Sequence, residues 1–148
     1  MFAIRPAQPV DLQAVHLVLK DCGLPFEDIA DDHLTDFLVL GHGKPVVGCI
    51  GIERRRNDAL LRSLAMFDFM RGDGWGQQLV RAIEAHALSI GISTLYLLTT
   101  TAAAFFDGQD YRRMDRAGAP EALQDTTQFS FLCPSNSTCL FKFISSNN

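Results

Sequence analysis

The stretch Arg-Gly-Asp-Gly-Trp-Gly at residues 71–76 decides the fold of this chain. An apolar run at 60–67 that is typical of a strand precedes it, and an amphipathic segment at 77–91 follows it. A strand, a glycine turn and a helix in this order make an anion site, because glycine lets the backbone turn sharply and the first helical N–H groups point at the ligand. Arg71 adds a guanidinium suited to phosphate oxygens. The stretch predicts a site for a phosphorylated cofactor; the alternative is an ordinary glycine turn at the start of a core helix.

The spacing of the glycines narrows the choice of cofactor. No Gly-Lys-Ser/Thr ends the loop, so it is not a Walker A motif. A dinucleotide fingerprint starting at Gly74 would need glycine where the chain has Leu79. The pattern that fits is Arg-x-x-Gly-x-Gly, which resembles the pyrophosphate loop of the GNAT acyltransferases that use acetyl-CoA.

Composition limits the class of protein. The chain has 148 residues, 47% hydrophobic and 20% charged, with a net charge of −4, which predicts one domain over 1–148 with a frayed tail at 144–148. Basic residues cluster only at 54–56, no apolar run has the length of a membrane span, and the N-terminus does not read as a signal peptide. Four scattered cysteines suit a reducing compartment. We therefore expect a cytoplasmic protein without nucleic-acid or membrane partners.

Turn residues divide the rest of the chain into short elements. Residues 9–11 start an apolar-faced helix that includes Leu12, Val15, Leu17, Val18 and Leu19, and 23–25 end it. The acidic residues between 27 and 36 are read as a solvated helix face, with an amine-binding site as the alternative. We expect strands at 2–6, 37–40, 45–53, 59–67, 93–98, 111–115 and 129–133, and helical segments at 77–91, 102–106 and 120–124.

The order of these elements is that of the GNAT fold over nearly the whole chain. Several strings are sharper and resemble the arsenic-resistance branch of GNAT N-acetyltransferases: Gly-Leu-Pro at 23–25, Leu-Leu-Arg-Ser-Leu-Ala at 60–65, Leu-Tyr-Leu-Leu-Thr-Thr-Thr-Ala at 95–102 with Phe105-Phe106, Ala119-Pro120 and Leu132-Cys133-Pro134. The resemblance implies an α/β (α+β) fold with a central mixed sheet of about six to seven strands and about four helices, splayed at the CoA site.

The resemblance also assigns residues to acetyl-CoA. Leu64, Ala65 and Met66 would form the strand end beside the pantetheine arm, where the strand splays from 96–98. Thr100 or Thr101 would contact the same arm, and Trp75 would either stack near the cofactor or pack the helix start. The pyrophosphate would bind the loop formed by Arg71, Gly72, Asp73, Gly74, Trp75 and Gly76.

The chemistry that the resemblance implies is attack of a neutral amine on a thioester, so the amine must lose a proton. Glu53 is the candidate base, acting directly or through a water; the alternative is a surface carboxylate at a strand end. Ser63 either bonds substrate or water or is a satisfied strand residue. Arg62 either recognises a substrate carboxylate or faces solvent.

The chain departs from the wider superfamily at the expected general acid. The position that often carries tyrosine is Phe106, and the glycine of the following Gly-Phe/Tyr pair is Asp110. A phenyl ring cannot donate a proton, so the thiolate leaves unassisted or Tyr111 or Tyr96 helps. Asp110 also occupies a position where the local turn suits glycine.

Cysteines and histidines suggest no metal site. Cys133 and Cys139 could bind arsenic(III) across a six-residue separation, but inert buried thiols are the usual state of such residues. The histidines lack metal-ligand spacing.

The function that we expect is acetyl transfer from acetyl-CoA to the amine of a small molecule in arsenic detoxification, such as an amino-acid-like organoarsenical or a glutamate analogue. Two alternatives stay open: a GNAT scaffold that senses arsenic(III) without catalysis, and acetylation of a protein N-terminus or lysine. GNAT enzymes are often dimers, so a homodimer is possible.

Overall fold

The computed structural model describes residues 1–126, 129 and 136–145. In this part of the chain the strands form a mixed seven-stranded sheet with hydrogen-bonded order β1-β2-β3-β4-β5-β7-β6. The chain divides into two compact units, Met1–Glu53 with Arg62–His86, and Arg54–Leu61 with Ala87–Asn148. The strand β4 (Asp58–Met66) contributes residues to both units.

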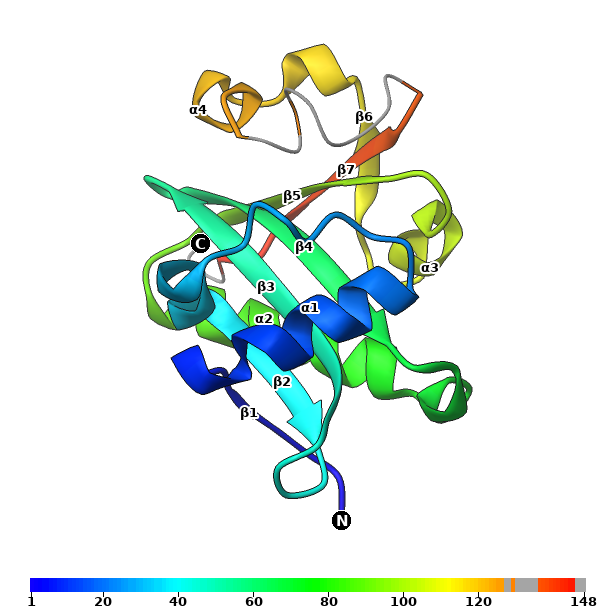
Figure 1. The fold of residues 1–148 in the computed structure, drawn as a ribbon. Helices are drawn as coiled ribbons and strands as arrows, with labels where there is room; N and C mark the ends of the chain where they lie inside the picture. Colours follow the sequence, from blue (N-terminus) through cyan, green and yellow to red (C-terminus); the bar gives the residue numbers. More distant parts are fainter. Residues whose placement is uncertain (127–128, 130–135, 146–148) are drawn as a thin grey trace. The chain divides into compact units, whose positions relative to one another are not determined.

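The first unit places helices on both faces of its strands. In Figure 1, α1 lies in front of the strands and α2 behind them. Strands β1 and β2, and then β2 and β3, pair antiparallel, as the predicted hairpin requires. The elements of this unit are β1 (Ala3–Pro6), α1 (Leu12–Asp21), β2 (Phe37–Gly41), β3 (Val46–Arg55), the second half of β4, α2 (Trp75–Ser89), and the 3-10 turns η1 (Pro9–Asp11), η2 (Asp31–Asp36) and η3 (Asp68–Met70).

The helix α1 packs one face on the sheet. Val15, Val18 and Leu19 are fully buried in a cluster that includes Phe37 and Cys49. Leu17, which the sequence analysis placed on the same face, is instead exposed. Two residues past Val15 is about 200° around the helix, so Leu17 points away from the face that Val15 begins.

One glycine of β3 is required for space rather than for conformation. A Cβ on Gly51 would come within 2.3 Å of the Phe37 ring on β2. Phe37 lies directly opposite Gly51 in the strand register and is almost completely buried. The ring therefore fills the position that any side chain at residue 51 would need.

The second unit contains the parallel pairing of the sheet. The first half of β4 pairs parallel with β5, and β7 pairs antiparallel with both β5 and β6. A small apolar cluster covers these strands with Leu123 of α4 and Phe129. The elements are β5 (Thr94–Thr99), α3 (Ala103–Asp107), β6 (Arg112–Met114), η4 (Arg116–Gly118), α4 (Glu121–Gln124) and β7 (Thr138–Phe143).

The predicted elements that have an observed counterpart lie within two residues of it, and the observed strand β7 was not predicted. The helix α2 begins at Trp75 rather than at residue 77, so the last two residues of the glycine stretch are helical. Sequence patterns had left the segment of β7, Thr138–Phe143, without an assigned element. The strand predicted at 129–133 and the frayed tail at 144–148 fall mainly outside the described residues.

Candidate functional site

The glycine loop adopts a backbone conformation that glycine alone takes readily. Gly72 has φ 92° and Gly74 has φ 84°. An added Cβ at either residue would meet no atom within 4 Å, so the requirement for glycine is conformational rather than steric. Arg71, Gly72, Asp73 and Gly74 are all exposed. The loop thus presents its backbone to solvent between η3 and α2.

The start of α2 supplies backbone donors next to this loop. The first helical hydrogen bond runs from Gln78 N–H to Gly74 O, 3.1 Å. The N–H groups of Trp75, Gly76 and Gln77 precede it, and by position such groups point out of the helix end. Buried Leu79, Val80 and Ile83 anchor the helix. A fixed helix start with positive dipole is suited to a phosphate group.

Arg71 carries a mostly solvent-exposed guanidinium at the entrance to the loop. Its Nε lies 3.5 Å from Oδ1 of Asp68, which is itself exposed. Its Nη2 lies 3.7 Å from the Sγ of Cys22, a weak contact. Both contacts are long and weak, so the guanidinium can reorient toward a bound anion with little loss of interaction energy.

Trp75 packs at the start of α2, as one of its two expected roles requires, and its contact with the cofactor stays a prediction. Its ring meets Phe2 edge-on with centroids 6.4 Å apart, and Phe2 also contacts His42. Trp75 is half-buried. Its ring therefore packs the start of α2 against Phe2, the residue just before β1.

The end of β4 lies against β3. Phe67 N–H donates to Val47 O, and Met66 O accepts from the Cys22 thiol at 3.4 Å. Ala65 and Met66 are buried and Leu64 is half-buried. A Cβ on Gly48 would stand 3.1 Å from Ala65 O, so the two strands approach closely here.

Ser63 lies within β4 and has φ 65°, a left-handed conformation that is uncommon for serine. Its Oγ accepts a hydrogen bond from Arg62 Nε at 3.0 Å, and its carbonyl accepts from the Cys49 thiol at 3.3 Å. Burial raises the pKa of Cys49 above its usual range. Ser63 is thus held from both sides within the strand, next to the buried Arg62.

The guanidinium of Arg62 is at the centre of a buried ionic cluster. Its Nη1 donates to Oδ2 of Asp28 and to Oε1 of Glu53, the latter at 2.7 Å. Its Nη2 donates to Oδ1 of Asp28 at 2.8 Å and more weakly to Pro25 O at 3.4 Å. The side chain is 1% exposed. Asp28, Glu53 and Arg62 are called the carboxylate cluster below.

Electrostatics favour the charged forms of Asp28 and Arg62 in this cluster. Burial by itself would raise the pKa of Asp28, but the hydrogen bonds and charge of Arg62 outweigh it and lower the pKa. Burial would likewise lower the pKa of Arg62, and its bonds to Asp28 and Glu53 instead raise it. Arg62 therefore does not face solvent, and Glu53 is a buried, ion-paired carboxylate rather than a surface one.

The remaining predicted residues belong to the second unit. Thr100 and Thr101 are exposed, and the hydroxyl of Thr99 accepts from the N–H groups of Thr101 and Ala102 at the start of α3. Tyr111 is buried, with its ring 5.3 Å from Phe106 and Lys142 Nζ over its face. Only 3% of the surface of Tyr111 is exposed to solvent.

Asp110 adopts the backbone conformation that was expected to require glycine in the turn before Tyr111. It has φ 71°, the conformation that the family pattern provides with glycine. Asp and Asn are the side chains that tolerate this region best. The turn is therefore kept despite the substitution.

Of the two cysteines that could bind arsenic(III), the structure describes Cys139. Cys139 is buried on β7, and burial raises its pKa to about 11. Cys133 lies outside the described residues. Among the described residues, no group of three His, Cys, Asp or Glu side chains could hold a metal ion.

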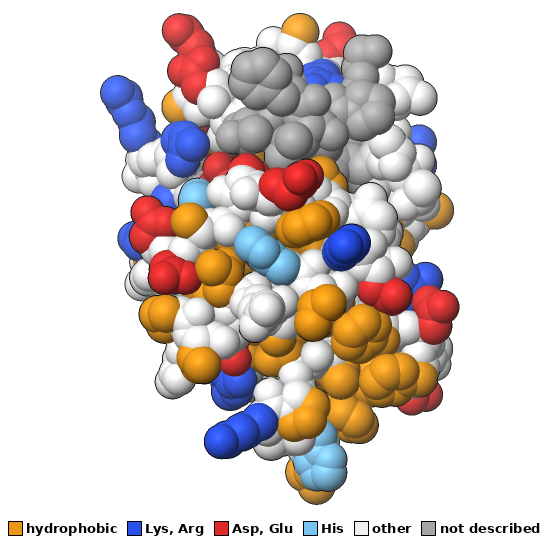
Figure 2. Space-filling view, in the orientation of Figure 1, with side chains coloured by type: hydrophobic (Ala, Val, Ile, Leu, Met, Phe, Trp, Pro, Cys, Tyr) orange, Lys and Arg blue, Asp and Glu red, His pale blue; other side chains and the backbone are white. Residues whose placement is uncertain are grey.

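Two features were missed by sequence reasoning. Asp28 was grouped with solvated acids, although the proline turn before it was the signal that the chain folds back toward the sheet. Phe69 was not considered, yet it is 69% exposed and stacks on Phe67 with centroids 5.9 Å apart. Figure 2 shows apolar side chains gathered at the lower right of the view, over η3.

Comparison with known proteins identifies the family. Residues 7–107 match the acetyltransferase (GNAT) family. The chain belongs to this family. Over 110 residues it is 29% identical to an uncharacterized N-acetyltransferase of Chlorobaculum tepidum, an alignment that covers 73% of this chain and 68% of the relative.

Solved structures agree on the GNAT fold. Two complexes of N-acetylglutamate synthase from Neisseria gonorrhoeae with CoA, one with L-arginine and one with N-acetyl-glutamate, superpose with TM-scores of 0.79 and 0.83 at 21% identity. They match 96% and 98% of this chain, which spans only 33% and 35% of theirs. A Mycobacterium tuberculosis protein in complex with CoA has a TM-score of 0.77 at 17% identity, covering 95% of this chain and 98% of its own.

These findings confirm the expected GNAT fold and the enzyme class, an N-acetyltransferase with acetyl-CoA as co-substrate. In the described part of the chain, no helix has the length and hydropathy to cross a membrane. The arsenic-resistance branch, the acceptor and the individual site residues stay predictions.

Proposed function

We propose that the chain transfers the acetyl group of acetyl-CoA to the amine of a small molecule, in the cytoplasm and as part of arsenic detoxification. The observation that carries the donor half is the exposed glycine loop, with Gly72 and Gly74 in the left-handed region, between β4 and the start of α2. Its backbone donors and Arg71 fit a pyrophosphate, and family membership supplies the donor.

The donor site that we propose extends along β4. The loop from Arg71 to Gly76 would hold the pyrophosphate, and the strand end from Leu64 to Met66 would line the pantetheine arm. Thr100 and Thr101 of the second unit are proposed to contact the same arm; both are exposed. A strand edge can pair with the amides of such an arm as it does with a peptide.

The proton chemistry is assigned to the carboxylate cluster. Glu53 would take one proton from the acceptor ammonium, directly or through a water, leaving a neutral amine. The amine nitrogen then bonds to the thioester carbon, the carbon–sulfur bond breaks, and the second amine proton ends on the CoA thiol. Ser63 would hydrogen-bond substrate or water beside Glu53. Tyr111 is proposed as the acid, although its burial makes unassisted departure of the thiolate an equal competitor.

The arsenic role rests on the sequence strings that resemble that branch, and the cytoplasm on Cys22, Cys49 and Cys139, which are free thiols. Expression in an arsenic-sensitive bacterium tests the role. Growth should recover in the presence of an amine-bearing organoarsenical and not in the presence of arsenite alone. Equal growth with and without the gene would contradict it.

The test of the catalytic function is acetyl-CoA binding by calorimetry, followed by thiol release when amines are added. We expect saturable binding and amine-dependent release. Failure to bind acetyl-CoA at millimolar concentration would contradict the whole proposal.

A further inference from the structure

Three aromatic side chains form a partly exposed row on one face of the second unit. Tyr96 of β5 stacks on Phe141 of β7 with ring centroids 6.2 Å apart, and Phe141 meets Phe143 edge-on at 5.3 Å. Tyr96 and Phe141 are half-buried, and Phe143 is 72% exposed. These three rings are called the aromatic row below. Exposed aromatic side chains are enriched where proteins contact one another.

The strand register places two charged residues on the same face as the aromatic row. Residues directly opposite each other on neighbouring strands point to one side of a sheet. Phe141 lies opposite both Tyr96 and Arg112 of β6. Leu60 of β4 lies opposite Tyr96, and Asp58 precedes Leu60 by two residues. Asp58 and Arg112 therefore flank the row on either side.

The rest of this part of the sheet is well covered. Leu95, Leu97 and Leu140, which face the other way, are almost completely buried. On the aromatic face itself, Leu123 and Phe129 cover the strands further along. The exposure of Phe143 is therefore confined to one area at the end of β7.

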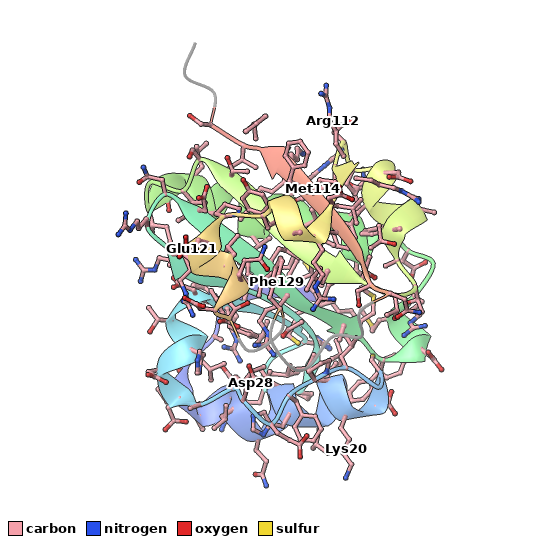
Figure 3. All side chains as sticks on the ribbon, turned by 90° about the horizontal axis from the view of Figure 1, so that it is seen from above. Lys20, Asp28, Arg112, Met114, Glu121 and Phe129 are labelled. Atoms are coloured by element: carbon pink, nitrogen blue, oxygen red, sulfur yellow. The ribbon has the colours of Figure 1, made fainter. Side chains whose placement is uncertain are left out.

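Neither flanking charge has a partner in the part of the chain that the structure describes. The Asp58 carboxylate makes no hydrogen bond or ion pair there, and its partial burial raises its pKa. Arg112 is exposed, and Figure 3 shows its side chain extending outward from β6. Three strand spacings, roughly 14 Å, separate β4 from β6, so the two charges do not pair within one chain.

A two-fold axis makes this face complementary to itself. An axis parallel to the strands, between β5 and β7, places β4 of one copy against β6 of the other, because the strand order β4-β5-β7-β6 is reversed by the rotation. The two aromatic rows then face each other, and each Asp58 faces an Arg112. The two residues are offset by one cross-strand pair, roughly 7 Å, which an arginine side chain spans.

The sheet edge is a poorer contact for a second copy. The edge strand β6 has only three residues, and two of them are the exposed Arg112 and Arg113. Short length and positive charge are usual protections of an edge strand against pairing with another chain. A second copy is therefore better accommodated on the face than at the edge.

We propose that a second copy of this chain docks face to face on the aromatic row, with Asp58 of each copy paired to Arg112 of the other. Burial of Phe143 supplies the apolar contact. The two ion pairs fix the direction of the copies and give the partly buried carboxylate a counter-ion. This interface goes beyond the proposed acetyl transfer and does not depend on it.

Sedimentation equilibrium of the full chain tests the oligomeric state. The mass should double from 16.4 kDa as the protein concentration rises from about 1 μM to about 1 mM. A protein that stays monomeric at the highest concentration overturns the inference, and so does one that forms species larger than a dimer.

Two exposed phenylalanines provide a matched pair of variants. Phe143→Ser should raise the dissociation constant of the dimer about 30-fold or more, as loss of a central aromatic contact does. Phe69→Ser is the control, because Phe69 is 69% exposed but belongs to η3 in the first unit. Equal effects of the two substitutions, or none from Phe143→Ser, would place the interface elsewhere and overturn the inference.

Charge reversal tests the two-fold pairing itself. Asp58→Arg and Arg112→Asp each place like charges opposite one another twice, so either variant alone should dimerise at least about 10-fold more weakly. An equimolar mixture of the two variants restores both ion pairs and should dimerise nearly as wild type does. A mixture as weak as its components overturns the pairing. Phe143→Ser, a change at an exposed position, keeps the interface testable if a charge variant does not fold.

Discussion

Two arginines on neighbouring segments of the first unit differ in what they are bound to. Arg62 is 1% exposed and gives every N–H group to the protein, whereas Arg71 is 59% exposed and contacts an exposed carboxylate and a thiol among the described residues. They stand nine residues apart, on either side of the proposed donor strand. Arg62 thus stabilises the fold, whereas Arg71 is available to bind a ligand.

The difference separates stability from binding. A buried guanidinium is required to neutralise carboxylates that folding has already desolvated. An exposed one contributes little to folding, because water and salt screen its partners. Substitution of Arg62 should therefore mainly lower the free energy of unfolding, and substitution of Arg71 should mainly lower the affinity for acetyl-CoA.

The largest expected effect is that of Arg62→Ala. It leaves Asp28 and Glu53 buried without their counter-ion, which typically costs about 3–5 kcal/mol. Thermal and urea denaturation measure the loss. Adding Asp28→Asn and Glu53→Gln to the same chain should recover part of it, because the buried charges are then gone. A melting curve for Arg62→Ala that coincides with wild type would remove the distinction between the two arginines.

Arg71→Ala should act on the donor alone. We expect acetyl-CoA affinity to fall by about 10- to 100-fold, as for loss of a charge-assisted hydrogen bond, with stability unchanged within about 0.5 kcal/mol. Calorimetry at low and high salt measures both the affinity and its screening. Arg81→Ala, an exposed arginine on α2, is the control and should bind as wild type does. Equal losses at both arginines would point to general charge rather than to the loop.

Gly74→Ala should cost about 1–2 kcal/mol, the usual price of a left-handed conformation for a residue with a Cβ. No clash contributes, since the added Cβ meets no atom within 4 Å. Denaturant titration measures the loss, and acetyl-CoA binding should weaken with it. Gly118→Ala is the control: its φ is not in the left-handed region, and its Cβ would make an ordinary 3.5 Å contact with Met114. If both glycine variants lose the same stability, backbone conformation is not the reason for Gly74.

The smallest effect is expected in acid. Because the pKa of Asp28 is lowered from its ordinary value of 3.8, its contribution to stability is complete above that value and is lost as pH falls through the folded pKa. Denaturation across this range should therefore show a shallower acid loss for Asp28→Asn than for wild type. Asp11, whose pKa is lowered by Arg5, gives a second acid-sensitive pair for comparison. Parallel acid curves for wild type and Asp28→Asn would show that the pairing with Arg62 does not stabilise the fold.

Local chemistry made much of the fold predictable. The hairpin of β2 and β3 has its turn glycines, and the glycine stretch is followed by apolar residues at helical spacing. The strand β7 was missed because its place depends on β5 and β6, which flank it in the sheet and lie well before it in sequence. Pairing partners of a strand are set by the tertiary fold, which a short window does not contain.

In the candidate site, too, local features could be predicted from the sequence and long-range contacts could not. Gly72 and Gly74 could be assigned from the sequence because the backbone conformation of a loop is a property of the loop itself. Arg62 could not, because its partner Asp28 is 34 residues away and both hypotheses for it placed its charge outside the protein. Only the folded chain shows that its five donors are already in use.

The contact of Phe37 with Gly51 has a consequence for how the first unit assembles. Side chains alternate between the faces of a strand, so Glu53 shares a face with Gly51. A slip of one residue between β2 and β3 would turn Glu53 to the other face, away from Arg62. It would also place a residue bearing a Cβ against the Phe37 ring, since Gly51 is flanked by Ile50 and Ile52. The Phe37 ring therefore selects the strand register: it fits against β3 only in the register that also brings Glu53 to Arg62.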